Sequence, residues 1–174
     1  LLLADGQTWA YDLTTSLWSA RTSLNKPFYR GLLTATSKNR IFISDAFGGK
    51  IYLMQENVFT EDGTELVFEV TSVHLLKEGD QLAISECWVD LETGLGTNDG
   101  QGLNPRGMLQ ISKDGGHIWG MERFVALGKT GRYTTRAVRR RIGSARDIAV
   151  RFRITDPVPR RIAGAYLMLD GGVS

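Results

Sequence analysis

The chain has only one cysteine and two histidines among its 174 residues, and these shortages exclude several kinds of site. Cys87 alone cannot form an internal disulfide, and its neighbours Trp88 and Val89 indicate a buried thiol in a strand, which favours folding in the cytosol. His74 and His117 stand far apart and do not give the ligand spacing of a zinc site. We therefore expect no metal and no cofactor.

Long apolar runs and catalytic signatures are also lacking. No apolar run approaches the roughly 20 residues needed to cross a bilayer, and no signal-peptide pattern is present, so we expect no membrane association. The glycine-rich loop over 92–107 has no following Lys-Ser/Thr and no following helix, which excludes a phosphate-binding loop of the usual type. No nucleophile-elbow pattern occurs either. We expect a protein that is not an enzyme and, because the first residue is Leu1, a fragment or a processed product.

Charge is unevenly divided along the chain. Residues 1–128 hold 10 Lys+Arg against 16 Asp+Glu, a net of −6, whereas residues 129–174 hold 11 against 3, a net of +8. Such a division favours association with an acidic partner, or head-to-tail pairing of copies of the same chain.

Short strands separated by turn signals fill the first part, with little that predicts a helix. Four consecutive strands joined by tight turns would form an antiparallel meander, the unit of a propeller blade, and the aromatic residues near Trp9 are typical of the end of a preceding blade. The expected strands are Gln7–Leu13, Leu17–Ala20, Leu32–Ala35, Arg40–Ser44, Ile51–Met54 and Glu65–Val70.

Composition changes over residues 74–81, which we interpret as a connection between two domains. The sequence thus predicts an all-β protein: the end of a β-propeller-like region over 1–73, then a β-sandwich over 82–174. Alternation over Leu82–Leu91 places Leu82, Ile84, Glu86, Trp88 and Asp90 on one face. Further strands are expected at Met108–Ser112, Arg123–Leu127, Tyr133–Ile142, Asp147–Thr155 and Ile162–Leu169.

The segment from Ser112 to Trp119 resembles the Asp-box turn, whose pattern is Ser-x-Asp-x-Gly-x-Thr-Trp. Here Ser112, Asp114, Gly116 and Trp119 keep the pattern, while Ile118 replaces the usual Thr. The aspartate can accept hydrogen bonds from turn amides, glycine permits positive φ, and the tryptophan packs beneath the hairpin. We expect a structural turn and not a catalytic site.

Together with this turn, Gly128–Tyr133, the run Arg139–Asp147 and Thr155–Val158 resemble the C-terminal region of packaged-DNA stabilisation proteins, also called tail hub or nozzle proteins, of short-tailed bacteriophages. The resemblance is best over about residues 82–171. In that family the arginine run often carries Trp where this chain has Val138.

The resemblance implies a virion protein of the phage tail, made in the host cytoplasm, that closes the portal end of the filled capsid, retains the packaged DNA and later conducts the genome outward. It implies a homo-oligomeric ring, six-fold by expectation. The partners would be the portal-adaptor protein and other tail proteins, such as a plug, a needle or tail fibres. DNA would pass through the lumen with little specific contact, because a wall rich in cations would retard its sliding.

Arginine side chains crowd the last strands, and we expect them to lie at an interface, since guanidinium groups bind carboxylates bidentately and tolerate partial burial. The candidates are Arg136, Arg139, Arg140, Arg141, Arg146, Arg151 and Arg153. Arg151 and Arg153 share one face of a strand whose other face is apolar. In Tyr133–Ile142 the faces do not sort cleanly, so either a bulge resets the register or one face is an interface, which we prefer. A charge ladder neutralised within the same molecule is the alternative.

A rival interpretation is a carbohydrate-binding or glycoside-hydrolysing Asp-box β-propeller protein, with Trp9 and Trp119 as exposed aromatic candidates. Hydrolysis would require paired carboxylates or a nucleophile pair at a defined separation. Glu122 and Tyr133 could serve, but nothing in the sequence fixes their positions.

Overall fold

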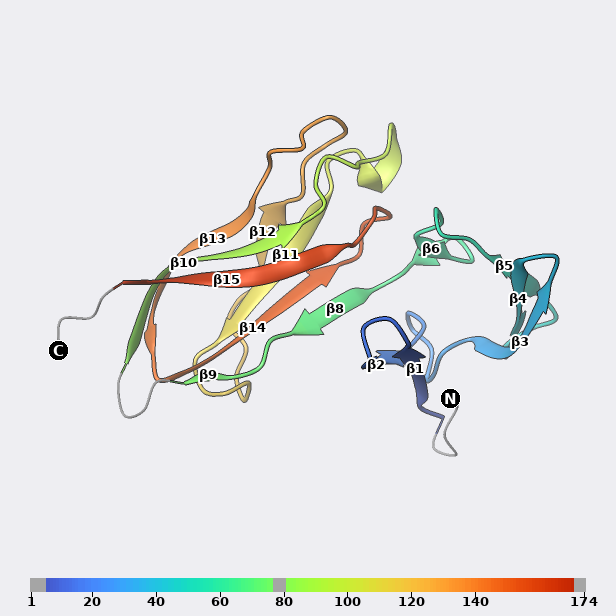
Figure 1. Ribbon diagram of the computed structural model, residues 1–174, viewed down its shortest axis with the longest axis horizontal. Helices are drawn as coiled ribbons and strands as arrows, with labels where there is room; N and C mark the ends of the chain where they lie inside the picture. Colours follow the sequence, from blue (N-terminus) through green and yellow to red (C-terminus); the bar gives the residue numbers. More distant parts are fainter. Residues whose placement is uncertain (1–5, 77–80, 171–174) are drawn as a thin grey trace. The chain divides into compact units, whose positions relative to one another are not determined.

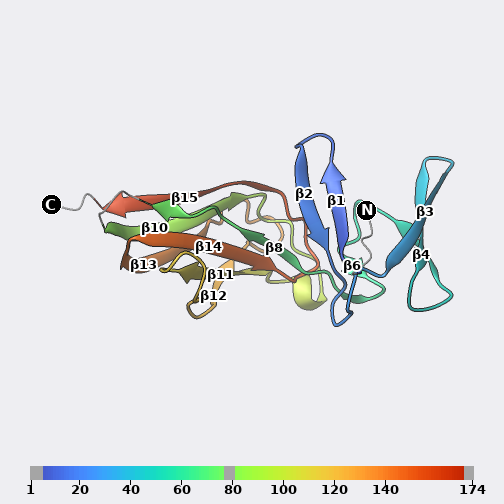
Figure 2. The same ribbon diagram turned by 90° about the horizontal axis from the view of Figure 1, so that it is seen from below.

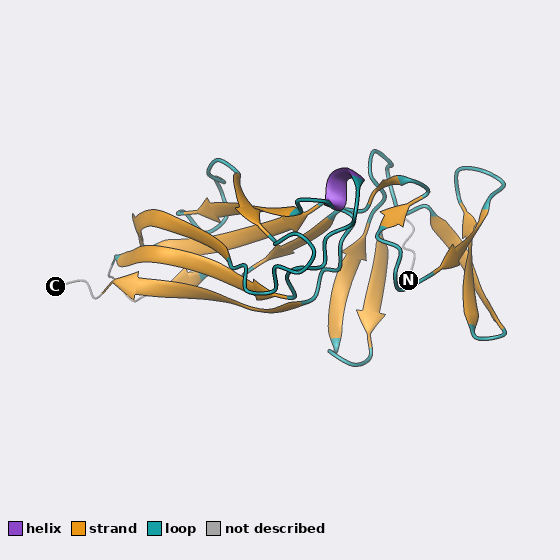
Figure 3. Ribbon diagram, turned by 90° about the horizontal axis from the view of Figure 1, so that it is seen from above, coloured by secondary structure: helices purple, strands orange, loops and turns teal. Residues whose placement is uncertain are grey.

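The computed structural model describes residues 6–76 and 81–170 and divides the chain into two compact units, Leu1–Leu66 and Val67–Ser174. Strands make up both units, as Figure 1 shows, and the described residues contain one short 3-10 helix, η1 (Gly100–Gly102), drawn in purple in Figure 3. The prediction of an all-β protein is confirmed.

The first unit consists of hairpins and one small antiparallel sheet. Strands β1 (Thr8–Asp12) and β2 (Leu17–Arg21) pair with each other, and β3 (Gly31–Ser37), β4 (Arg40–Asp45) and β5 (Ile51–Met54) form a three-stranded sheet. The short strands β6 (Thr60–Glu61) and β7 (Thr64–Glu65) make another hairpin. Positive φ at Lys38 and Asn39 gives the two-residue turn between β3 and β4 the twist that such hairpins prefer.

Little of the first unit is buried. Among the described residues of this unit, Ile43 is the one apolar side chain that is buried. Leu33 and Ile51 are 69 and 73 % exposed. Three of the four strands expected for a meander form the β3-β4-β5 sheet. The propeller architecture itself stays a prediction.

The second unit is a sandwich of two antiparallel sheets. One sheet has the order β13-β10-β15, formed by β13 (Ala137–Ala145), β10 (Leu82–Leu91) and β15 (Ile162–Asp170). The other has the order β12-β11-β14-β8, formed by β12 (Arg123–Ala126), β11 (Arg106–Ser112), β14 (Asp147–Ile154) and β8 (Phe68–Thr71), and β9 (Leu75–Leu76) also pairs with β14. Figure 2 shows these strands from a second direction.

Apolar side chains of both sheets fill the space between them. Ile84 and Cys87 of β10 contribute from one sheet, and Leu109 of β11 and Phe152 of β14 from the other, each at most 2 % exposed. Burial in this core raises the pKa of the Cys87 thiol to about 11.

The boundary between the units differs from the predicted one. The run Glu65–Val70 was expected as one strand of the first region, but β7 ends at Glu65 and β8 begins at Phe68, where it pairs with β14 of the sandwich. The sandwich unit therefore begins at Val67 and not at residue 82. Of the expected connection at 74–81, residues 77–80 lie outside the described residues.

A bulge at the centre of the β13-β10-β15 sheet changes which residues face the core. Ile84 pairs with Leu169 and Glu86 with Met168, which are adjacent in β15, so Ser85 is an extra residue in β10. On the other side of β10, Ser85 lies opposite two residues of β13. Leu82 and Ile84 are buried before the bulge, whereas Cys87, Val89 and Leu91 are buried after it. The predicted face of Leu82, Ile84, Glu86, Trp88 and Asp90 is wrong beyond Ser85, because the bulge exchanges the two faces.

Candidate functional site

The predicted Asp-box turn is held by a compact set of hydrogen bonds around Ser112 and Asp114. The Ser112 hydroxyl donates to Asp114 Oδ1 at 2.7 Å and accepts from the Gly116 amide at 2.8 Å. The Ile118 amide also donates to Asp114 Oδ1, at 2.8 Å. The hydrogen bonds from Ile118 and Ser112 lower the pKa of the Asp114 carboxyl. Positive φ at Gly115 and Gly116 closes the turn. These hydrogen bonds hold the turn, and its purely structural role stays a prediction.

Trp119 completes this turn and lies against the arginine-bearing face of β14. The guanidinium carbon of Arg151 is 3.9 Å from the centre of the Trp119 ring, a cation–π contact. Trp119 is half-buried, and Arg151 of the same molecule covers one face of its ring. Trp9 is half-buried as well, and its indole nitrogen donates to Gln7.

Arg151 and Arg153 are neutralised by the chain itself. Glu69 of β8 accepts from Arg153 Nη2 at 2.6 Å, Glu122 accepts from Arg153 Nη1 at 3.0 Å, and Arg151 Nε lies 3.5 Å from Glu69. The apolar side chains of β14 lie on the opposite face, as predicted. For these two arginines, the alternative of a charge ladder neutralised within the molecule describes the structure.

Arg136 and Arg140 contact the outer face of the β13-β10-β15 sheet. Arg140 Nε donates to Glu86 at 2.8 Å, and the Arg136 guanidinium lies 5.0 Å from the centre of the Trp88 ring. Trp88 in turn stacks on Tyr166 of β15, with 5.5 Å between ring centres. Arg146 is exposed, and no contact of its side chain with another described residue is present.

Arg139 and Arg141 have a different environment from the other candidates. Both line a hollow of about 300 Å³ together with Arg123 of β12. Arg139 Nη1 donates to the Leu109 carbonyl oxygen at 3.2 Å, and within the described residues no carboxylate contacts Arg123, Arg139 or Arg141. Burial and the neighbouring charge of Arg123 lower the pKa of the Arg139 guanidinium.

The strand that carries these arginines is shorter and more irregular than predicted. It begins at Ala137 and not at Tyr133, since residues 128–135 form turns in which the Arg132 amide donates to Lys129 and the Thr135 amide to Arg132. Arg141 adopts φ of +59° where two residues of β13 oppose Ser85. The bulge that the sequence left open as one alternative is therefore present.

Comparison with known families identifies the sandwich unit. The family model for bacteriophage P22 Gp10, beta-sandwich, matches residues 67–170, the same residues that form the two sheets. The chain belongs to this bacteriophage P22 Gp10 β-sandwich family. No curated protein matches the chain.

Membership of the P22 Gp10 β-sandwich family confirms the predicted resemblance to tail hub or nozzle proteins and gives the chain a structural role in a phage tail, within the virion. The match begins at residue 67, earlier than the resemblance seen in the sequence, because β8 contributes a strand to the second sheet. Tail proteins of this family are structural.

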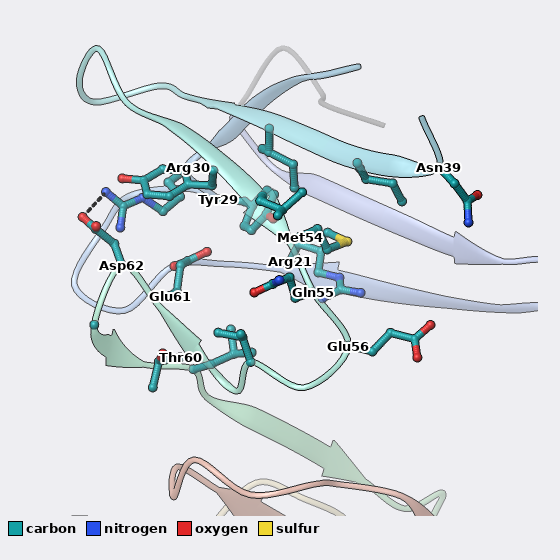
Figure 4. Close-up of a pocket in the computed structure, with 17 residues that line it drawn as sticks. Arg21, Tyr29, Arg30, Asn39, Met54, Gln55, Glu56, Thr60, Glu61 and Asp62 are labelled. Atoms are coloured by element: carbon teal, nitrogen blue, oxygen red, sulfur yellow. Dashed lines mark hydrogen bonds and ion pairs between the residues drawn. The ribbon is translucent and has the colours of Figure 1, made fainter. Parts of the chain in front are cut away.

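The first unit, outside the P22 Gp10 β-sandwich match, contains a pocket of about 890 Å³ that the sequence did not predict. Figure 4 shows Arg30 at one end, where its guanidinium meets Asp62 at 3.3 Å, and Asp45 accepts from the same group at 3.2 Å. Lys50 also binds Asp62, at 2.9 Å. These residues come from separate parts of the first unit, with Asp45 at the end of β4, so no local motif indicates them.

Two carboxylates around Arg30 are poor candidates for glycoside hydrolysis: Asp62, which lines the pocket, and Asp45, which binds Arg30. The hydrogen bond from Arg30 lowers the pKa of Asp45, and the hydrogen bond from Lys50 lowers the pKa of Asp62. A glycosidase needs one carboxyl group whose pKa is raised, so that it can protonate the leaving group. Asp45 and Asp62 are therefore held in the ionised form that a general acid cannot use.

In the part of the chain that the structure describes, no group of three or more His, Cys, Asp or Glu side chains is placed to hold a metal ion. Nor does any helix in those residues have the length and apolar character needed to span a membrane.

Proposed function

We propose that this chain is part of a tail hub or nozzle that closes the portal end of the filled capsid, retains the packaged DNA and forms part of the conduit for its ejection. Copies of the chain would form a homo-oligomeric ring, assembled in the host cytoplasm. The expectation of six subunits comes from the resemblance to tail hub or nozzle proteins. The ring would bind the portal-adaptor protein and other tail proteins such as a plug, a needle or tail fibres. The observation that carries the proposal is the family match over residues 67–170.

The distribution of paired charges supports the conduit part of the proposal. Arg140, Arg151 and Arg153 are engaged with Glu86, Glu69 and Glu122 of the same chain, which leaves them weak ligands for phosphate. A surface whose cations are neutralised in this way would let DNA slide past with little specific contact.

The rival carbohydrate function has less support. One face of the Trp119 ring is covered by Arg151, and Asp45 and Asp62 are held ionised by Arg30 and Lys50. Stacking on a sugar needs a free aromatic face, and hydrolysis needs a protonated acid.

Ring formation and docking can be tested separately. We expect the wild-type chain to give a discrete oligomer in mass photometry and rings in negative-stain images, and a wild-type chain that stays a monomer would contradict the ring. The charge reversal Arg139→Glu/Arg141→Glu should impair docking of the neighbouring tail component, because like charges would then meet at that contact. Lys129→Glu/Arg132→Glu is the matched control, since both residues are exposed and lie on a turn outside the hollow. Unaltered docking in the first variant would remove these arginines from the interface.

A further inference from the structure

The hollow beside Arg123 is bounded by two strands that each end a sheet. Strand β12 pairs only with β11, and β13 only with β10, among the strands that the structure describes. Phe124 and Val138 supply apolar surface, and Arg123, Arg139, Arg140 and Arg141 supply the charge. Edge strands carry backbone N–H and C=O groups that are not used within the sheet. The hollow therefore combines the edges of two strands, an apolar wall and several arginine residues.

Residues 139–141 all border this hollow, although neighbouring side chains of a regular strand point to opposite faces. Arg139 donates to Leu109 of the facing sheet and Arg140 donates to Glu86 on the outer face, so the alternation holds as far as Arg140. The bulge at Arg141 and Ile142, with Arg141 at φ of +59°, interrupts the alternation after that point. A left-handed conformation is strained for a residue with a side chain, and strain of this kind is typical of functional positions.

The fold leaves most of this charge without a counter-charge. Arg140 is paired with Glu86, but no carboxylate of the described residues contacts Arg123, Arg139 or Arg141. The Leu109 carbonyl oxygen holds Arg139 in place, 3.2 Å from Nη1, so at least one guanidinium is pre-positioned. A group that brought carboxylates here would gain charge-assisted hydrogen bonds without ordering that arginine again.

The chemistry of the hollow fits an extended peptide better than duplex DNA. DNA presents phosphates along a rod and is bound by an extended basic track, whereas these cations converge in about 300 Å³ beside Phe124 and Val138. An extended peptide alternates its side chains and can pair its backbone with a strand edge, so it can place carboxylates and apolar groups side by side.

The described sandwich of a second copy offers few free carboxylates to fill the hollow. There, Glu69, Glu86, Glu92 and Glu122 are paired with arginines of their own chain. Asp114 is engaged in the Asp-box turn, Asp147 with His74 and Asp156 with the Arg106 amide. Within the described residues 67–169, Asp90 and Asp99 are the exposed carboxylates for which no hydrogen bond or ion pair is present. This favours a different protein as the source of the carboxylates.

We propose that the hollow between edge strands β12 and β13 is the docking site for an extended acidic peptide segment of another protein, whose carboxylates bind Arg123, Arg139 and Arg141. The inference deepens the proposed function and rests on it for the nature of the partner, a second component of the tail. It adds the kind of segment that the partner must present: acidic residues alternating with apolar ones in an extended conformation.

The test uses the full chain and a fluorescein-labelled hexapeptide of alternating valine and glutamate, with binding followed by fluorescence anisotropy. We expect saturable binding that Arg123→Gln/Arg141→Gln weakens by about tenfold or more, because two charge-assisted contacts are lost. Lys129→Gln/Arg132→Gln, which removes the same charge from an exposed turn, should change the affinity less than about twofold. A peptide with glutamine in place of glutamate should not bind.

A second variant keeps the test decisive if the first one loses its fold. Arg123→Lys/Arg141→Lys keeps both charges but removes the planar fork, and we expect it to lose part of the affinity while its circular dichroism stays unchanged. Equal weakening in the hollow variant and the turn variant would overturn the proposal, since it would show attraction by net charge alone.

Three other outcomes would also overturn the proposal. One is a short DNA duplex that binds more tightly than the peptide and is lost in Arg123→Gln/Arg141→Gln. Another is self-association of the chain that the peptide competes away, which would make a second copy the occupant. The third is unchanged peptide binding in a folded hollow variant. Because the peptide assay needs no ring, a chain that binds the peptide as a monomer would contradict the ring and leave this docking site standing.

Discussion

Removal of the Ser112 hydroxyl is the sharpest test of the Asp-box turn. Ser112 is fully buried, and its Oγ makes two short hydrogen bonds, one donated to Asp114 and one accepted from the Gly116 amide. Each such bond contributes about 1 kcal/mol net, so Ser112→Ala should lower the free energy of unfolding of the sandwich by about 2 kcal/mol. Alanine fills nearly the same space, so a cavity contributes little.

Calorimetry can measure this change, provided that the transition of the sandwich is identified among those of the two units. Phe152→Ala identifies it, because Phe152 lies in the sandwich core at 2 % exposure. For a domain of about 100 residues, 2 kcal/mol corresponds to a fall in Tm of about 8 °C or more. Ser144→Ala is the control, since Ser144 is exposed on β13 of the same domain. If Ser112→Ala shifted Tm no more than this control does, the hydroxyl would not hold the turn.

Three more perturbations test the core and the turn. Gly107→Ala would place a methyl group 2.5 Å from the Phe152 ring, so unfolding should become easier by about 1–3 kcal/mol in urea titrations, and Phe152→Leu should recover part of the loss. Cys87, with its pKa raised to about 11, should resist iodoacetamide at neutral pH until urea unfolds the sandwich, and mass spectrometry would reveal early alkylation if the thiol were accessible. The pKa of Asp114 is lowered on folding, so its stabilisation is complete above the unfolded pKa of about 4 and is lost as pH falls through the folded value; Asp114→Asn should flatten that part of the acid unfolding curve.

Sequence patterning predicted strands well where one face alone is buried. In β14, Val150, Phe152 and Ile154 are buried, and Arg151 and Arg153 lie on the opposite face, as the alternation predicts. The Asp-box turn was equally predictable, because Ser112, Asp114 and Gly116 act on atoms within four residues of themselves. Hydrogen bonds between residues that are close in the sequence can therefore be predicted from that segment alone.

Features that depend on distant pairing were not predictable in the same way. The bulge opposite Ser85 arises where β10 must pair with both β13 and β15, and its only local signal is Gly143 within a strand. Likewise, β8 pairs with β14 although their residues, such as Val70 and Phe152, are far apart in the sequence. The sequence near Val70 does not indicate that partner, so the pattern predicts the run from Glu65 as one strand of the first unit.

The division of charge along the chain has a different meaning in three dimensions. The sequence suggested a dipolar molecule, with −6 before residue 129 and +8 after it. Yet Glu69, Glu86, Glu92 and Glu122 of the acidic part bind Arg140, Arg151, Arg153 and Arg161 of the basic part, so folding itself cancels much of the dipole. Those ion pairs link distant strands of one domain.

This cancellation determines which substitutions can report on assembly. Reversal of Arg153 would leave Glu69 and Glu122 facing a like charge within the sandwich and would weaken the fold, so a loss of rings in that variant would say nothing about contacts between subunits. Arg123, Arg139 and Arg141 have no such internal partner in the described chain, and their replacement removes charge without breaking an ion pair. A phenotype confined to these three arginines, with an unchanged unfolding curve, is therefore the result that separates recognition from stability.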